Sequence, residues 1–386
     1  MAKYKKIIIL FGLMFSGLII FYYSLTPLRR NSAKRRILHA THILEPDWSK
    51  VISKTSDGYQ ADLTSSTLLV DGIFPSMKGP TTFRTFLLED KEDEIYWITG
   101  LEAKANTKHE TQNESDDFIC HVNLYHSEVE HFARMGMVDR INIQVPQLIT
   151  LTKGDLDFNF PEGFGYPIFS NEKIFLGTQA LNLNYSNSFF TINYDFKIKF
   201  QKNKERRLKP LYMRYAVLVL PYNVKDEFVY TDENINNKVS CVIPKGNHHG
   251  LNSLNEEGEA ITAFWKVPIG KHTYRSNFTK ILALDTIVRL HKINSHAHPY
   301  ATSISLRDIT ADSILFKSDI INYKNKIGLD KITSYSSVDG LELFPDHEYE
   351  LVEEVNNTSD SEIEMMGSMF LYFYDYKLDK IIDTIK

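Results

Sequence analysis

The sequence is poor in cysteine, with only Cys120 and Cys241 among 386 residues. Two cysteines are too few for a disulfide scaffold, although one bridge between them is possible. Positive charge is not in excess, because the net charge is −5, and this argues against a nucleic-acid partner. The sequence also lacks a glycine-rich phosphate loop, a Gly-x-Ser-x-Gly elbow and CxxC pairs. Hydrolytic and nucleotide-dependent functions are therefore disfavoured.

Sustained helical periodicity is missing after the first 28 residues. Instead, short apolar or alternating runs rich in Ile, Val, Phe and Tyr are separated by Gly, Pro, Asn and Asp. This pattern predicts an all-β fold of sandwich type. The clearest predicted strands are at 115–126, 211–220, 281–291 and 368–374. No internal period indicates a solenoid or a propeller.

Polar segments divide the chain. Residues 29–50 form a basic, polar linker, and the basic run 201–209 separates two strand-rich halves. We therefore predict a first domain at 51–205 and a second at 206–386. The alternative is that 201–209 is a long turn within one domain. The polar segments 102–116 and 245–258 are predicted to be surface insertions.

Residues 7–23 form one uncharged apolar run of about the length that crosses a bilayer, ending in Tyr22 and Tyr23. The sequence therefore predicts a single-pass membrane anchor at 1–28. A cleaved signal peptide is the alternative, but no small-x-small cleavage site follows the run. Basic residues on both sides, in excess after the run, would by the loop-charge rule keep the body cytoplasmic.

The most specific chemical motif is His296-Ala297-His298. Residues two apart in a strand point to the same face, so both imidazoles can reach one metal ion. Met365, in the Glu-Met-Met run at 364–366, could add a soft thioether. Two imidazoles and a weak methionine suit copper better than structural zinc. Taken alone, the same residues are also typical of an ordinary strand and a core methionine.

The second half resembles the copper type II, ascorbate-dependent monooxygenases, the family of peptidylglycine α-hydroxylating monooxygenase and dopamine β-monooxygenase. The resemblance rests on six segments in the family's order: 267–270, 296–298, 303–308, 343–346, 364–365 and 370–374. It implies two consecutive antiparallel jelly-roll domains after the anchor and an extracytoplasmic body. It also implies copper bound by His296, His298 and Met365, dioxygen or peroxide as co-substrate, and ascorbate or another external reductant.

The first half resembles the family's N-terminal jelly roll at 160–165 and 180–185. This implies a possible second metal site, for electron transfer, at Cys120, His121 and Asn184, where only His121 keeps an expected imidazole. A Cys120 thiolate can still bind copper. His126 or His131 could be recruited, although neither shares the strand parity of His121.

The resemblance does not indicate which substrate the protein binds. The peptide hydroxylase holds a substrate carboxylate with an arginine and a tyrosine, and Asn294 and Met369 occupy the matching positions here. A glycine-extended peptide is therefore disfavoured, and the substrate stays open between a small molecule and a peptide.

A second resemblance involves residues 291–306 and 76–80, which are similar to bacterial membrane-anchored proteins with a His-x-His-Pro-[Phe/Tyr]-Ala signature. It adds His291 as an accessory site residue. Two functions follow from the sequence. The first is a membrane-anchored copper-dependent monooxygenase, and the alternative is a non-catalytic copper-binding or interaction protein of the same fold.

Overall fold

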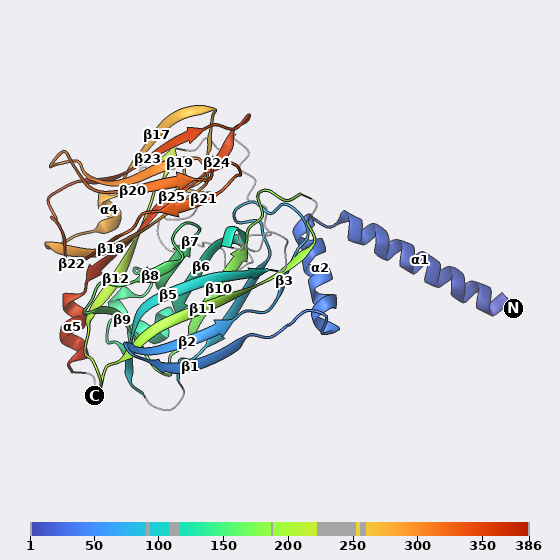
Figure 1. Cartoon of the computed structure of the whole chain (residues 1–386), viewed down its shortest axis with the longest axis horizontal. Helices are drawn as coiled ribbons and strands as arrows, with labels where there is room; N and C mark the ends of the chain where they lie inside the picture. Colours follow the sequence, from blue (N-terminus) through green and yellow to red (C-terminus); the bar gives the residue numbers. More distant parts are fainter. Residues whose placement is uncertain are drawn as a thin grey trace.

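The computed structural model describes residues 2–89, 93–107, 116–186, 188–221, 252–254 and 260–384. Strands make up most of the body, which confirms the all-β prediction (Figure 1). Helix α1 (Ala2–Ser24) projects away from the body and α2 (Pro27–Ala40) lies beside it. Cys241 and most of the predicted insertion at 245–258 lie outside the described residues.

One large sheet runs through both halves of the chain. Its order is β1 (Ser49–Thr55), β2 (Gly58–Thr64), β11 (Phe190–Lys202), β5 (Ile95–Thr107), β9 (Phe164–Phe169), β12 (Lys209–Val217), β25 (Gly367–Tyr374), β18 (Val288–Ala297) and β22 (Tyr335–Leu343). Two short strands, β3 (Leu68–Val70) and β8 (Asp157–Asn159), pair with β11 and β5. The halves join where β12 runs parallel to β9 and antiparallel to β25.

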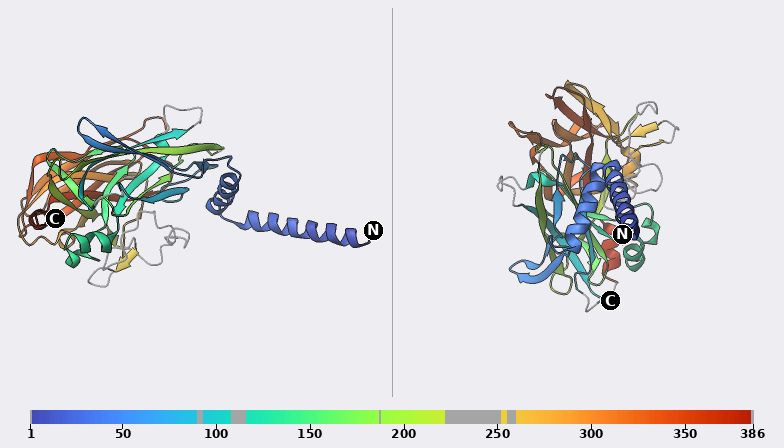
Figure 2. Two further views of the ribbon diagram at one scale, coloured as in Figure 1. Left: turned by 90° about the horizontal axis from the view of Figure 1, so that it is seen from below. Right: turned by 90° about the vertical axis from the view of Figure 1, so that its right-hand side faces the viewer.

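Each half packs a second sheet against its part of the large one (Figure 2). In the first half this sheet is β4 (Thr81–Phe86), β10 (Ile174–Ala180), β6 (Ile119–His126) and β7 (Gln147–Thr152). In the second half it is β17 (Gly270–Asn277), β23 (Tyr349–Asn357), β19 (Ala301–Asp308), β20 (Ser313–Asn322) and β21 (Leu329–Ile332).

Smaller elements complete the described chain. The short strands are β13 (Leu220–Pro221), β14 (Asn252–Leu254), β15 (Ala260–Thr262), β16 (Trp265–Val267) and β24 (Ile363–Met365). The short helices are α3 (Glu128–Arg134), the single turn η2 (Val138–Arg140), α4 (Thr279–Leu282) and α5 (Tyr376–Ile382).

Alternation explains why these segments form strands. In β11 the apolar side chains on one face are buried, while the residues between them are half-buried and polar. A strand with this period-two pattern covers a core on one side only. The buried apolar residues of β11 are Phe190, Ile192, Tyr194, Phe196, Ile198 and Phe200.

The hydrophobic core of the first half extends across the predicted domain boundary at 205. The core of the first half includes Met213 and Tyr372 from the second. A separate cluster packs Leu378 and Ile382 of α5 against Trp97 of β5. The C-terminal segment therefore completes the packing of the first half.

The membrane anchor stays a prediction. Among the helices whose side chains the structure describes, none is long and apolar enough to cross a membrane. Residues 7, 8, 10 and 11 of the apolar segment lie outside that description.

Candidate functional site

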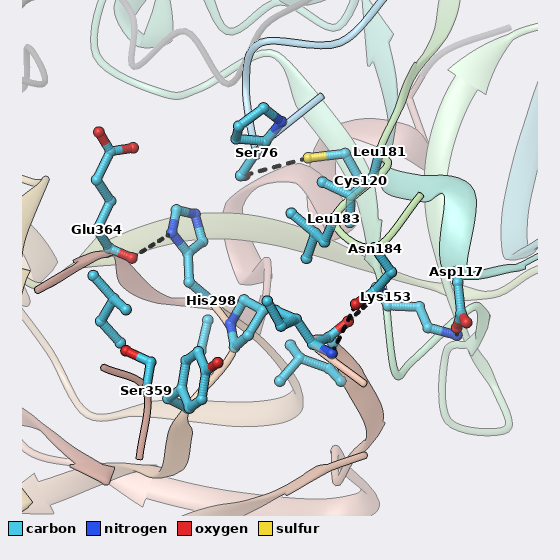
Figure 3. Close-up of a pocket in the computed structure, with 18 of the residues that line it drawn as sticks. Ser76, Asp117, Cys120, Lys153, Leu181, Leu183, Asn184, His298, Ser359 and Glu364 are labelled. Carbon is cyan, nitrogen blue, oxygen red and sulfur yellow. Dashed lines mark hydrogen bonds and ion pairs between the residues drawn. The ribbon is translucent and has the colours of Figure 1, made fainter. Parts of the chain in front are cut away.

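A cavity of about 340 Å³ opens between the two halves (Figure 3). The first half contributes Ser76, Cys120 and Asn184 to its walls, and the second contributes His296, His298 and Tyr300. Figure 3 places Ser76 and Cys120 on one wall and His298 with Glu364 on another. The structure therefore brings residues of both predicted metal sites, though not Met365 or His121, to one shared space.

Strand pairing explains why both histidines of the HxH motif face this cavity. In β18, His296 pairs with Ser368 and Ala297 pairs with Gly367. Ala297 is buried in the core of the second half, so the side chains on either side of it point to the opposite face. That face is the cavity wall, as the sequence pattern predicts.

The tautomer of His298 is fixed by the main chain. Its Nδ1 lies 3.2 Å from the carbonyl oxygen of Glu364, which can only accept a hydrogen bond. Nδ1 therefore carries the proton, and Nε2 is left with its lone pair. Nε2 is buried and has no hydrogen-bond partner among the described residues. A backbone carbonyl that orients one ring nitrogen while the other is free is the usual support of a metal-binding histidine.

The spacing of the two rings also fits one shared ion. The ring centres of His296 and His298 are 5.6 Å apart, and the ring planes are nearly perpendicular, at 85°. A metal–nitrogen bond of about 2.0 Å places the ion about 3.2 Å from each ring centre, so the centres can be about 6.4 Å apart at most. The distance between the rings is therefore within the range that one shared ion allows.

Both rings are kept neutral, as metal binding requires. Burial, together with the neighbouring His298 and His121, holds the pKa of His296 well below its usual value. Burial is also the main cause that lowers the pKa of His298, against a smaller opposing effect of Glu364. His121 of the first half also lowers the pKa of both groups through its charge.

Met365 does not line the cavity. It pairs with Trp265 across β24 and β16, and its fully buried side chain belongs to the core of the second half. Met365 as a copper ligand therefore stays a prediction. The next residue, Met366, packs in a different cluster with Met77 and Phe264, and the Phe264 ring lies 6.2 Å from that of His298.

Cys120 lies on the opposite wall, and His121, which does not line the cavity, contacts its thiol. The Sγ atom of Cys120 lies 3.3 Å from Nδ1 of His121 and 3.4 Å from Oγ of Ser76. Burial acts to raise the pKa of the thiol, but His121, Ser76 and the Met77 main chain together lower it below its usual value. Thiolate character makes Cys120 a chemically competent ligand or nucleophile.

Asn184 has a structural contact of its own. Its Nδ2 donates to the carbonyl of Ile327 at 2.8 Å, and its Oδ1 accepts from the main-chain nitrogen of Ile327 at 3.0 Å. The amide therefore holds the loop between β20 and β21 of the second half against the first. Both of its polar groups are engaged in that contact, so as a metal ligand Asn184 stays a prediction that would require this contact to break.

His291, predicted as an accessory residue, does not line the cavity. Its Nδ1 donates to the carbonyl of Ser337 at 3.0 Å, and its ring lies 4.2 Å from that of Phe164. Burial lowers its pKa. The structure gives this histidine a packing contact between the halves.

Sequence reasoning missed several residues of the cavity. Asp117 and Lys153 line it as an ion pair 3.0 Å apart, and Asp117 also pairs with Lys326 of the second half. Tyr300, directly after the HxHP segment, has a left-handed backbone with φ of 76°. Strain of this kind at a cavity wall is a recognised sign of a functional position, but no sequence signal marks it.

Comparison with known proteins gives little. No family model matches the chain, and no curated protein matches it. Among solved structures, a peptide-N(4)-(N-acetyl-β-D-glucosaminyl) asparagine amidase aligns with 85% of this chain and 96% of its own, at 9% identity and a TM-score of 0.33.

Two further structures give similar values. PNGase F from Flavobacterium meningosepticum covers 85% of this chain and 96% of its own at 10% identity and a TM-score of 0.32. PNGF-II covers 80% and 65% at 8% identity and a TM-score of 0.29. These values are too low to assign a fold or a function.

Proposed function

We propose that the protein binds copper in the cavity between its halves, through His296 and His298, and oxidises an organic molecule there. The observation that carries this proposal is the buried Nε2 of His298, which has no partner among the described residues while Nδ1 is fixed by Glu364. An unsatisfied buried nitrogen costs about 1–3 kcal/mol, and a bound ion removes that cost.

Copper is the ion that the surroundings favour. The wall opposite the two imidazoles carries the Cys120 thiol, a soft donor. Bound copper would supply one-electron chemistry and an open position for dioxygen or peroxide. The apolar side chains of Leu181, Ile327 and Leu329 would exclude water and hold the hydrocarbon part of a substrate. Ascorbate or another external reductant is the proposed electron source.

We also infer that each half is a jelly roll and that the chain is a divergent member of the ascorbate-dependent copper monooxygenases. Antiparallel pairing within each half and two packed sheets per half support this. The protein is proposed to be a single-pass membrane protein with an extracytoplasmic body, based on the apolar run at 7–23.

Copper stoichiometry tests the proposal. Full-length protein in detergent is loaded with Cu(I) and dialysed, and bound metal is counted. Wild type is expected to retain copper that the His296→Ala/His298→Ala variant loses. The matched control, His272→Ala/His347→Ala, removes two histidines outside the cavity and should bind like wild type. Equal copper in all three proteins would contradict the site.

A non-catalytic copper-binding protein is the second candidate, and the position of Met365 in the core favours it. Oxygen uptake distinguishes the two candidates. With ascorbate present, a monooxygenase consumes oxygen well above the level of the His296→Ala/His298→Ala variant. A carrier binds copper equally well but shows uptake at the level of that variant.

A further inference from the structure

A second cluster of metal-binding side chains lies in the first half, away from the cavity. One ligand atom each of His126, His131 and Glu172 lies within 4.8 Å of the others, and all three side chains are buried. His126 ends β6, His131 lies in α3, and Glu172 lies in the turn between β9 and β10. It is the one such group among the described residues.

The distances within the cluster suit a small divalent ion. Nδ1 of His131 lies 3.0 Å and 3.1 Å from the two carboxylate oxygens of Glu172. Two atoms that each bind an ion at about 2.0–2.2 Å lie about 3–3.5 Å apart. The hydrogen bond between His131 and Glu172 thus occupies the place where an ion would bind both groups.

The cluster also contains a buried nitrogen with no hydrogen bond of normal geometry among the described residues, Nδ1 of His126. Its Nε2 is engaged with the hydroxyl of Tyr166 at 2.9 Å. Nε2 is therefore oriented by the Tyr166 hydroxyl, and the other polar contact of the ring is to the main chain of Ser127. A rotation of the His126 ring is required for full convergence, because the two imidazoles lie partly stacked, 4.0 Å apart at 32°.

Charge around the cluster is balanced. Arg134 pairs with Asp93, and Arg140 pairs with Asp375, so the two guanidinium groups nearest to His131 are each matched by a carboxylate. The cluster itself contributes the single carboxylate of Glu172. An ion bound there would be neutralised in part by that carboxylate, in a site that solvent does not reach.

We propose that His126, His131 and Glu172 form a binding site for a divalent transition-metal ion, with zinc as the ion that two imidazoles and one carboxylate favour. Binding would join α3 to the end of β6 and to the turn after β9. This site is independent of the copper cavity and does not rest on the proposed function.

The experiment compares zinc binding by full-length wild type, Glu172→Gln and His296→Ala/His298→Ala in detergent. After loading with Zn²⁺ and dialysis, wild type and the cavity variant should each retain one zinc that Glu172→Gln lacks. Zinc should raise the melting temperature of wild type and the cavity variant by several degrees, and that of Glu172→Gln hardly at all. Glutamine keeps the shape and a hydrogen bond to His131, so this variant should fold.

Two outcomes would overturn the proposal. If Glu172→Gln and wild type retain the same zinc, the cluster is a buried hydrogen-bond network only. If the cavity variant loses the zinc, the ion belongs to His296 and His298. The His126→Gln variant gives an independent check, because the visible absorption of Co²⁺ in place of zinc should weaken when one imidazole is removed. Absorption equal to that of wild type would also contradict the site.

Discussion

At the scale of single residues, the burial of the Glu353 carboxyl group lowers the stability of the second half. It lies on β23 and is fully buried, and neither carboxylate oxygen has a hydrogen-bond partner among the described residues. The close approach of β25 requires Gly367, because a Cβ there would lie 2.1 Å from Oε2 of Glu353. Burial raises the pKa of Glu353 to about 8. The folded protein therefore keeps this acid protonated at neutral pH.

This raised pKa predicts the pH dependence of stability. Glu353 stays protonated in the folded state while the unfolded chain loses the proton above pH 4.5, its ordinary value. The free energy of unfolding should therefore fall between about pH 4.5 and 8, by a few kcal/mol at about 1.4 kcal/mol per pKa unit. Glu353→Gln should remove this loss and be the more stable protein at pH 8, measured by urea unfolding at several pH values.

The adjacent residue, Glu354, provides a control, because its pKa is lowered and not raised. Glu354 is exposed, donors on Ser303 and Lys317 lower its pKa, and its contribution is present above pH 4.5 and lost as the pH falls. Glu354→Gln should therefore lower the free energy of unfolding slightly, by the same amount at every pH above about 4.5, and leave the fall between pH 4.5 and 8 as in wild type. A Glu353→Gln protein whose stability still falls up to pH 8 would show that another group is responsible.

At the scale of elements, the loop before β4 positions Ser76 and Met77 beside Cys120. The loop packs closely against β10 at Gly79, where a Cβ would lie 1.8 Å from the carbonyl oxygen of Ala180. Gly72, earlier in the same loop, has nothing within 4 Å of such a Cβ. Only one of the two glycines is thus required by packing.

Alanine substitutions test this difference. Gly79→Ala should lower the free energy of unfolding by about 2–3 kcal/mol, since the loop must move away from β10. It should also increase the rate at which Cys120 reacts with a thiol reagent, because the contact with Ser76 is lost. Gly72→Ala should stay within about 1 kcal/mol of wild type. Equal effects of the two substitutions would argue against the close approach.

The elements that could be predicted from the sequence are those formed by one continuous run of apolar and aromatic residues. The aromatic run at 368–374 is buried along nearly its whole length and forms β25, and 211–220 overlaps β12. The run 281–291 was expected as one strand, but α4 ends at Leu282 and β18 begins at Val288. Ala283 ends the helix in a left-handed conformation, which its residue type does not predict.

At the scale of the whole molecule, the two halves share a sheet, three hydrophobic clusters and a buried ion pair. Arg140 of the first half binds Asp375 through both carboxylate oxygens, and Asp375 also caps α5 by accepting from the main-chain nitrogen of Leu378. Asp375 is 2% exposed. A buried pair of this kind costs most when only one partner is removed.

Arg140→Met should therefore lower the free energy of unfolding by about 3 kcal/mol, because Asp375 would be left buried without its partner. Lys377→Met is the matched control, since it breaks an exposed pair with Asp139 across the same boundary and should cost about 1 kcal/mol or less. Tryptophan fluorescence and circular dichroism should give one coincident unfolding midpoint for each protein. Two separate transitions would show that the halves fold independently.

The candidate site could be predicted only in part, for reasons that lie at this same scale. The HxH spacing fixes a shared face within β18, and that prediction needs no tertiary information. Other parts of the sites depend on strand order and on turns. These are the position of Cys120 across the cavity, the hydrogen bonds of Asn184 with Ile327, and the hydrogen bond between His131 and Glu172. Contacts between residues 41 or more positions apart, such as that between His131 and Glu172, leave no local pattern in the sequence.

The position of β25 and α5 after the other elements of both halves has a consequence for biosynthesis. β25 is an internal strand of the large sheet, and α5 covers Trp97 in the first half. Neither half can close its core until β25 and α5 have left the ribosome and, for an exported body, have crossed the membrane. The chain must therefore wait with exposed strand edges, and a premature stop before β25 would leave both halves open to degradation.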